Sequence, residues 1–189
     1  MIAGPNGAGK TSAAPDLLQA AVGIDAFVNA DVIAQGLAGF SPASAAFEAG
    51  RIMLERLDEL ARAREDFAFE STLAGRSVRG RLTDLLGLGY DVHIFYLWLP
   101  SPDLAVARVR RRVESGGHEV PESVIRRRFW KSLVNFDRIY RLVATTWRMY
   151  DGSSLAGRPL IAHGTGTGRP VIADQTRWKE IHERIKELA

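Results

Sequence analysis

The sequence contains no cysteine, which excludes a disulfide framework, a thiolate zinc site and a cysteine nucleophile. It also lacks any run of about 18 apolar residues, so we expect no membrane span. The first residues lead directly into Gly4-Pro5-Asn6-Gly7, without the features of a secretory leader or a transit peptide. These absences predict a cytoplasmic protein that does not associate with membranes.

Charge of either sign is not in large excess. The 189 residues are 46% hydrophobic and 25% charged, with a net charge of +3. This composition is typical of a globular chain, and we predict one domain over residues 1–189. Residues 108–148 carry eleven Lys or Arg and four Asp or Glu, a local +7 that leaves −4 for the remainder. A confined basic segment favours a local anionic target and argues against nucleic acid as the partner.

Short apolar runs alternate with helical periods, which predicts an α/β fold with helices on both faces of a sheet. The helix over 43–64 has an apolar stripe that includes Phe47, Leu54, Leu57 and Ala61, and Pro15 should bend the first helix. The predicted strands are 1–3, 26–29, 67–70, 92–99, 148–150, 160–162 and 171–173. The predicted helices are 10–21, 43–64, 78–88, 103–114, 121–146 and 176–188.

The glycine-rich stretch Gly164-Thr-Gly-Thr-Gly168 has the composition of a nucleotide loop. Strand-like runs flank it on both sides, however, and no helix follows it directly. We therefore predict a hairpin turn here, within a C-terminal hairpin and helix over roughly residues 158–189.

A phosphate-binding pattern, G-x-x-x-x-G-K-[ST], begins at Gly4 and ends at Thr11. Its glycines let backbone N–H groups turn toward phosphate oxygens, and the following helix directs its positive end at the same anion. Only three residues precede it, so either a very short strand supports the loop or the natural chain begins upstream. The pattern predicts ATP bound by Gly4, Pro5, Asn6, Gly7, Ala8, Gly9, Lys10, Thr11 and Ser12, with Mg²⁺ on the Thr11 hydroxyl.

Two acids follow the next two predicted strands. The chain has no apolar run that ends in the Asp-Glu of hydrolases, and it lacks the Asn-Lys-x-Asp of guanine readers and the Leu-Ser-Gly-Gly-Gln of transporter ATPases. Asp31 is a candidate general base for a substrate hydroxyl, the alternative being a helix N-cap. Glu70 is a candidate to bind Mg²⁺ through water, to orient a substrate hydroxyl or to replace the hydrolase acid. The alternatives for Glu70 are a helix cap or a partner for Arg76.

An arginine-rich helical pair over roughly 108–130 surrounds Gly116-Gly117-His118. We predict a lid that closes over phosphates, with about half of its arginines solvated or paired with Glu114, Glu119 or Glu122. The arginines chosen for the phosphates are Arg112 and either Arg127 or Arg128. His118 is predicted to act as a hinge or a substrate hydrogen bonder rather than as a metal ligand.

The chain resembles the zeta toxin-like kinases, and within them a compact bacterial branch often labelled predicted ATPases. The resemblance rests on the loop, on Asn29-Ala-Asp31, and on the stretch from Phe69 to Arg76. It continues through the Gly-Gly-His-x-Val-Pro stretch that ends at Pro121. Four further pieces carry it: Gly89-Tyr-Asp91, Arg112-Val-Glu-Ser115, Ile125-Arg-Arg-Arg-Phe129 and Tyr150-Asp-Gly-Ser153.

The resemblance implies a P-loop kinase of three-layer α/β/α architecture, with a mostly parallel sheet and a helical lid. It implies ATP and Mg²⁺ as cofactors, a small-molecule hydroxyl such as that of UDP-N-acetylglucosamine as acceptor, and an antitoxin as partner. The implied catalytic residues are Asp31, Lys10, Arg112 and Arg128, and the substrate-binding residues are Glu70, Thr72, Arg76, His118 and Arg127. Two alternatives stay open: a nucleotide-dependent module associated with nucleic acid, and a degenerate ATP-binding protein.

Overall fold

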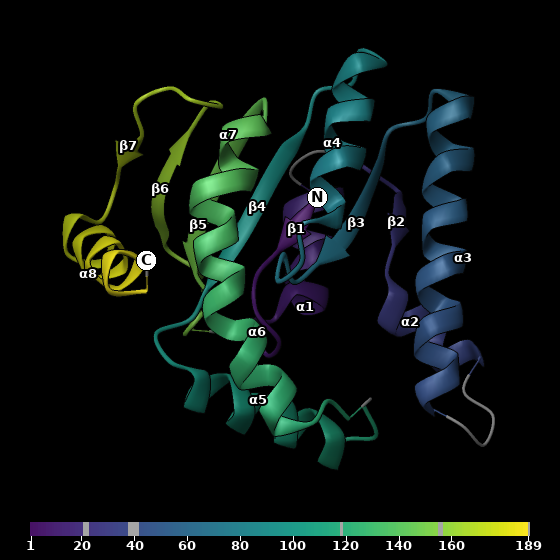
Figure 1. Ribbon diagram of the computed structural model, residues 1–189, viewed down its shortest axis with the longest axis horizontal. Coiled ribbons are helices and arrows are strands. Elements are labelled where there is room, and N and C mark those ends of the chain that lie inside the picture. The colour runs from purple at the N-terminus through teal and green to yellow at the C-terminus, as the bar shows by residue number, and fades with distance from the viewer. Residues whose placement is uncertain (21–22, 38–41, 118, 155–156, 189) are drawn as a thin grey trace. The chain divides into compact units, whose positions relative to one another are not determined.

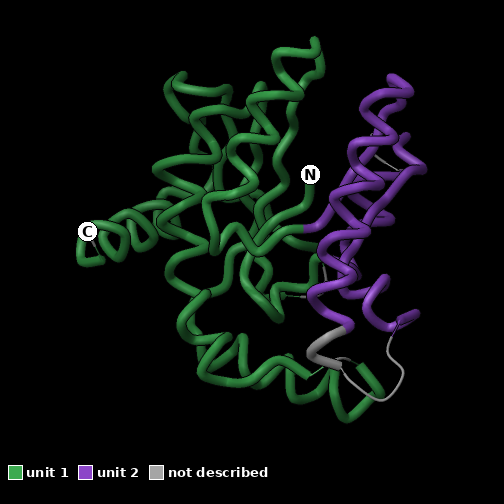
Figure 2. Tube along the Cα trace, turned by 45° about the vertical axis from the view of Figure 1, so that its right-hand side comes forward, with its two compact units in different colours: residues 1–10, 71–189 green, residues 11–70 purple. Residues whose placement is uncertain are grey.

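The computed structural model describes residues 1–20, 23–37, 42–117, 119–154 and 157–188. The chain divides into two compact units. The larger unit comprises Met1–Lys10 and Ser71–Ala189, and the smaller unit comprises Thr11–Glu70 (Figure 2).

The larger unit contains a mixed sheet in which β1, β4, β5, β6 and β7 follow one another. Strands β1, β4 and β5 are parallel, whereas β6 and β7 are antiparallel to their neighbours. The bounds are β1 (Ile2–Ala3), β4 (His93–Trp98), β5 (Thr146–Asp151), β6 (Leu160–Gly164) and β7 (Val171–Ile172). Five of the six β4 residues are buried, as expected for a central strand covered on both faces.

The short first strand is paired along its length with β4. The nitrogen of Met1 donates to the His93 carbonyl at 2.7 Å, and the Met1 carbonyl accepts from the Phe95 N–H at 3.0 Å. Ile2 lies opposite Phe95, and both Ile2 and Ala3 are fully buried. The very short strand envisaged from the sequence therefore supports the start of the glycine loop.

Helix α6 (Glu122–Asn135) crosses in front of β4 (Figure 1). The Tyr96 hydroxyl on β4 lies 3.0 Å from the Ser132 hydroxyl on α6, and Phe136 stacks on Tyr96 at 4.3 Å. Helix α8 (Gln175–Glu187) reaches β5 through Trp178, whose ring stacks on that of Trp147 at 6.0 Å. The other helices of this unit are α4 (Ser77–Gly87), α5 (Pro102–Glu114) and α7 (Arg141–Val143).

The helix predicted over 121–146 has three parts. Helix α6 passes into a π-helical turn, η2 (Phe136–Tyr140), and then into α7. The Arg141 N–H donates to the Phe136 carbonyl five residues back, which is the hydrogen bond of a π-turn. Periodicity alone did not predict this turn.

The smaller unit pairs β2 (Ala26–Val28) with β3 (Phe67–Ser71) in parallel, with Ala26 opposite Phe67. Its first helix changes from α1 (Lys10–Ala14) to a π-helical turn, η1 (Pro15–Ala20), at the proline. The helix therefore departs from α-helical geometry at Pro15, which has no N–H for the helical ladder, while the predicted bend stays a prediction.

The apolar stripe predicted on the long helix is wrong for two of its members. On α3 (Pro42–Ala63), Phe47 is 83% exposed and Leu54 is 47% exposed. The buried residues of α3 are Ala45, Ala49, Leu57 and Leu60. The buried face includes two alanines, which admit the close approach of α2 (Ala30–Leu37), a helix that the sequence analysis did not place.

The C-terminal part follows the prediction. Strands β6 and β7 form an antiparallel hairpin, and the Gly168 N–H donates to the Thr165 carbonyl at 2.7 Å. The Gly164–Gly168 stretch is therefore a turn, as predicted. The α/β class with a mostly parallel sheet is likewise confirmed. No helix in the described ranges is both long and apolar enough to cross a bilayer.

Candidate functional site

The glycine loop of the larger unit runs very close to its neighbours. Gly4 has a φ of +140° and Gly7 a φ of +76°, values that side chains rarely tolerate. A Cβ on Gly4 would collide with the Leu97 carbonyl of β4, and one on Gly7 would lie 2.6 Å from the Ala105 carbonyl of α5. The loop thus requires glycine at both positions for backbone reasons.

Polar groups are buried inside this loop. Lys10 is only 5% exposed, and its Nζ donates to the Pro5 carbonyl at 3.0 Å, so the side chain folds back over the loop. The Asn6 side chain is 8% exposed, and its Oδ1 has no hydrogen-bond partner in the described part of the chain. A buried oxygen without a partner is costly, and a bound donor such as water would relieve it.

Arg108 of α5 clamps the loop to the segment that follows β5. Its guanidinium donates to the Gly7 carbonyl at 3.5 Å, to the Gly152 carbonyl at 2.5 Å and to the Ser153 carbonyl. Burial lowers the pKa of Arg108, and the negative charge of Asp151 offsets part of that effect. The sequence analysis included Arg108 in the arginine-rich helices but did not select it.

Helical phase could have selected Arg108. Ala105 and Val109 are buried on α5, and Arg108 lies three residues after Ala105 and one before Val109, on the edge of the same face. Arg112 lies four residues after Arg108, about one helical turn, and therefore shares this side of the helix. The positions of the apolar residues around the helix are therefore the sequence signal that could have singled out Arg108.

The other arginines of the predicted lid are distributed over several environments. Arg112 is partly buried, whereas Arg127 and Arg128 are exposed. Arg110 and Arg126 both pair with Glu122, at 2.6 and 2.8 Å, so the expected pairing with glutamate is confirmed for these two. His118, predicted to act in this region, lies outside the described residues.

The Gly-Gly pair ends helix α5. Gly116 has a φ of +84°, and its N–H donates to the Val113 carbonyl, while the Gly117 N–H donates to the Arg112 carbonyl, both at 2.9 Å. These two bonds form a Schellman motif, which satisfies the last carbonyls of a helix. A hinge at this pair stays a prediction.

A hydrogen-bonded cluster lies in the smaller unit. The Thr11 hydroxyl donates to Glu70 Oε2 at 2.8 Å, and Asn29 Nδ2 donates to the same oxygen at 2.8 Å. Asn29 Nδ2 also lies 3.4 Å from the Thr11 hydroxyl. Asn29 follows β2 and Glu70 lies near the end of β3, so the parallel strands bring both to one edge, where open α/β sheets bind ligands.

Asn29 is the member of this cluster that the sequence analysis missed. Its Oδ1 accepts from the Asp31 N–H at 2.8 Å and from the Val32 N–H at 3.4 Å, which caps the start of α2. Asn29, rather than Asp31, is therefore the N-cap, and Asp31 lies in the first helical turn. An asparagine between a strand and a helix was the available signal.

The cluster suits a Mg²⁺ ion that keeps phosphate and water ligands. Within the described residues, no group of three or more His, Cys, Asp or Glu side chains could hold a metal. Thr11 and Glu70 offer a hydroxyl and a carboxylate, both oxygen ligands of the hard type that Mg²⁺ prefers. Mg²⁺ usually completes its octahedron with waters and substrate phosphates rather than with a protein cage.

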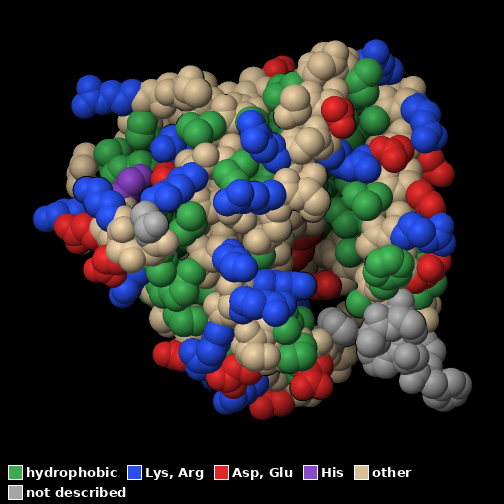
Figure 3. All heavy atoms as spheres, viewed as in Figure 1, with side chains coloured by type: hydrophobic (Ala, Val, Ile, Leu, Met, Phe, Trp, Pro, Cys, Tyr) green, Lys and Arg blue, Asp and Glu red, His purple; other side chains and the backbone are tan. Residues whose placement is uncertain are grey.

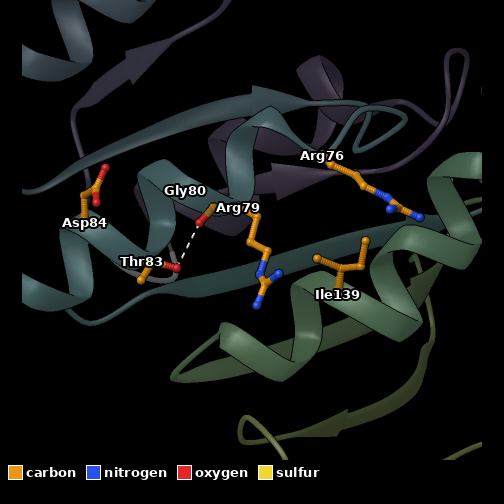
Figure 4. A pocket seen from close by; sticks show the side chains of 6 residues that line it. All are labelled: Arg76, Arg79, Gly80, Thr83, Asp84 and Ile139. Atoms are coloured by element: carbon orange, nitrogen blue, oxygen red, sulfur yellow. Dashed lines mark hydrogen bonds between the residues drawn. The ribbon is translucent and has the colours of Figure 1, made fainter.

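A cavity of about 610 Å³ lies between α4 and η2 in the larger unit. Figure 4 shows the Arg76 and Arg79 side chains on either side of Ile139, with Asp84 directed away from them. The Thr83 hydroxyl donates to the Arg79 carbonyl at 3.1 Å. Of the predicted substrate residues, Arg76 therefore lines a cavity, and Thr72 lies four residues before it.

The surface over α5 and α6 carries both signs of charge. Acidic and basic side chains alternate there, in the lower part of Figure 3, and Arg126 pairs with Asp103 at 2.7 Å.

The glycine loop on a short buried strand and the mostly parallel sheet define a P-loop NTPase-like α/β fold. Residues 1–129 match the AAA domain family, and the chain belongs to that family. It is 32% identical over 126 residues to an uncharacterized protein of Haemophilus influenzae, across 67% of this chain and 88% of the relative.

Solved structures share the fold at low sequence identity. Crystal structures of the AvrRxo1-ORF1:AvrRxo1-ORF2 complex with sulphate ions and with ATP match with TM-scores of 0.73 and 0.72, at 18% and 19% identity. They cover 95% of this chain, which spans 62% of the matched chain. The PezAT toxin–antitoxin system of Streptococcus pneumoniae matches with a TM-score of 0.67 at 16% identity, over 98% of this chain and 82% of that one.

Proposed function

We propose that the protein is an ATP- and Mg²⁺-dependent phosphotransferase that acts on a hydroxyl of a small molecule. The observation that carries this proposal is the bond from Thr11 to Glu70, reinforced by Asn29. Thr11 directly follows Lys10, the lysine of the glycine loop. A hydroxyl that directly follows the phosphate-binding lysine in the sequence, together with a carboxylate, is what P-loop enzymes use to hold Mg²⁺ on a nucleotide.

In this proposal, one set of residues binds the phosphates of the nucleotide and another set holds Mg²⁺. Backbone N–H groups of the glycine loop, such as those of Gly7 and Gly9, bind the phosphates together with the Lys10 ammonium, and Ser12 adds its N–H at the start of the helix. Bound Mg²⁺ would neutralise charge on the β- and γ-phosphates. The Thr11 hydroxyl would hold it directly and Glu70 through water. Arg108 keeps the loop in shape for this task.

The transfer step assigns the acceptor proton to Asp31. Its carboxylate accepts the proton of the acceptor hydroxyl as the oxygen attacks the γ-phosphorus. The bond between that phosphorus and the β–γ bridging oxygen then breaks, and ADP leaves. Arg112 and Arg128 stabilise the charge that spreads over the transferred group.

The acceptor assigned in this proposal is a UDP-amino sugar such as UDP-N-acetylglucosamine, as in zeta toxin-like kinases. Thr72, Arg76, His118 and Arg127 would bind it, together with Glu70. Support comes from the motifs shared with that family and from the fold shared with a toxin–antitoxin system. An antitoxin protein is the corresponding partner.

The proposal is tested with γ-labelled ATP and a panel of UDP-sugars and nucleosides, with products identified by mass spectrometry. The wild type should yield one phosphorylated acceptor, and chelation of Mg²⁺ should abolish the product. Asp31→Asn should bind ATP but form product at least about 100-fold more slowly, since general-base catalysis supplies 10²–10⁴-fold. Lys10→Ala should lose both ATP binding and product.

Asp25→Asn is the matched control, because this exposed carboxylate bonds only Gln19 among the contacts described. It should leave the rate unchanged. ATP consumption without any phosphorylated acceptor, or full transfer by Asp31→Asn, would refute the proposed reaction. The first outcome would instead favour a nucleotide-dependent module.

A further inference from the structure

The segment from Ser71, the last residue of β3, to Gly75 has a strained backbone. Leu73 has a φ of +55° although it is not a glycine, and it is 1% exposed. The left-handed conformation is uncommon for a branched side chain and persists only where its surroundings impose it. The Leu73 N–H donates to the Ser71 hydroxyl at 3.1 Å, and the Ser71 carbonyl accepts from the Gly4 N–H at 3.3 Å. The strained segment is thus bonded to the first glycine of the loop.

Two side chains hold this segment, one from the last residue of α6 and one from the last residue of η2. Asn135 Nδ2 donates to the Leu73 carbonyl at 2.8 Å, and the Tyr140 hydroxyl donates to the Gly75 carbonyl at 2.6 Å. Asn135 is 8% exposed and Tyr140 is fully buried. Burial also raises the pKa of Tyr140, so its hydroxyl remains a donor through the neutral range.

The π-turn explains why both side chains reach the same segment. Asn135 and Tyr140 are five residues apart, and in a continuous α-helix of 3.6 residues per turn they would point about 140° apart. A π-turn bonds residues five apart, so the residue five positions on comes round to the same side. Such turns are rare and are frequent at functional sites.

We propose that Asn135 and Tyr140 are positioning residues for phosphate transfer. The π-turn between them directs both side chains to the same segment. They hold the Leu73 and Gly75 carbonyls and so fix Ser71 against Gly4. Arg76, a residue proposed to bind the acceptor, directly follows the held segment. This inference rests on the proposed phosphotransferase function. Neither side chain touches a reacting atom in this scheme.

The test compares two tyrosines that each lose one buried hydrogen bond. Tyr140→Phe removes the bond from η2 to Gly75, and Tyr96→Phe removes the bond between β4 and Ser132 of α6. Both rings stay in place, and both variants should lower Tm by a similar amount, about 2–4 °C. Only Tyr140→Phe should lower kcat, by about tenfold or more, since small misplacements of reacting groups are costly.

The readouts are Tm, the Kd for Mg-ATP, and the kcat and KM for the acceptor that the wild type phosphorylates. If the wild type phosphorylates no acceptor in the panel, kcat and KM are measured for Mg²⁺-dependent ATP hydrolysis instead. A lower kcat in Tyr140→Phe, with a Kd within about twofold of wild type, supports the positioning role. Asn135→Leu should reproduce that pattern. Equal kcat in both tyrosine variants would overturn the positioning role and leave the phosphotransferase proposal standing. A wild type without turnover would overturn both.

Discussion

The Thr11 hydroxyl and the Glu70 carboxylate are separated by 59 residues in the sequence and joined by a hydrogen bond of 2.8 Å. Asn29 donates to the same carboxylate oxygen, so one oxygen receives two donors. A carboxylate held in this way is oriented before any ligand arrives. Such orientation is what a Mg²⁺ site requires, because the ion tolerates little departure from octahedral geometry.

Removing the charge of Glu70 should weaken Mg²⁺ binding. In Glu70→Gln the amide oxygen can still accept from Thr11, but the negative charge is lost. We expect the Mg²⁺ concentration for half-maximal turnover to rise about 10- to 100-fold, as for other groups that act on a metal through its ligands. Titration of Mg²⁺ at fixed ATP measures this. Glu183→Gln, on the exposed side of α8, should behave as wild type, and the same Mg²⁺ requirement in both variants would exclude Glu70 from the metal site.

Arg108 should govern the affinity for nucleotide without touching it. Arg108→Gln removes the hydrogen bonds to Gly7, Gly152 and Ser153, and each bond to a charged donor contributes about 1.5–3 kcal/mol. We expect the Kd for Mg-ATP to rise at least about tenfold by isothermal titration calorimetry. Arg108→Lys should recover little, because lysine lacks the planar fork. The exposed Arg111→Gln serves as control, and an equal Kd in all variants would contradict the clamp.

The glycine at position 7 should be indispensable. In Gly7→Ala the new Cβ would meet the Ala105 carbonyl at 2.6 Å, in a backbone conformation that costs alanine about 1–2 kcal/mol. We expect the stabilisation by Mg-ATP in a thermal shift experiment to disappear.

Gly80→Ala is the matched control for that loss. Gly80 lies inside helix α4, and a Cβ there would meet no atom within 4 Å. This substitution should raise stability by about 0.5–1 kcal/mol and preserve the response to Mg-ATP. A normal ligand response in Gly7→Ala would show that the loop tolerates a side chain.

Acid should destabilise the protein partly through Asp137. Burial alone would raise the pKa of this carboxyl, but the His182 hydrogen bond and the charge and hydrogen bond of Arg141 hold it below 3.8, its ordinary value. Because the folded-state pKa is the lower one, the contribution is complete above about pH 4 and is lost as the pH falls through the folded value.

Urea unfolding of wild type and Asp137→Asn measures this contribution. The difference in unfolding free energy between them should be largest near about pH 6 and should shrink toward about pH 3, where the wild-type carboxyl begins to gain its proton. A difference that stays constant over this range would assign the effect of the substitution to packing rather than to charge.

Local patterns determined much of this protein. The spacing of three glycines, Lys10 and Thr11 predicted the phosphate loop, and the alternation of apolar runs predicted the α/β sheet. The glycines at 116 and 117 and the turn at 164–168 likewise marked where elements end. These features depend on residues within a few positions of one another, so the local backbone chemistry specifies them.

Tertiary structure alone decided which polar side chains meet. Asn29, Glu70 and Thr11 come from three separate elements, and Asn135 reaches Leu73 across 62 residues. The burial of alanines rather than Phe47 on α3 depended on how that helix is rotated about its axis against its neighbours. The spacing of residues in the sequence does not fix this rotation. Packing of whole elements is what sets it, because each helix buries the face that fits the surface beside it.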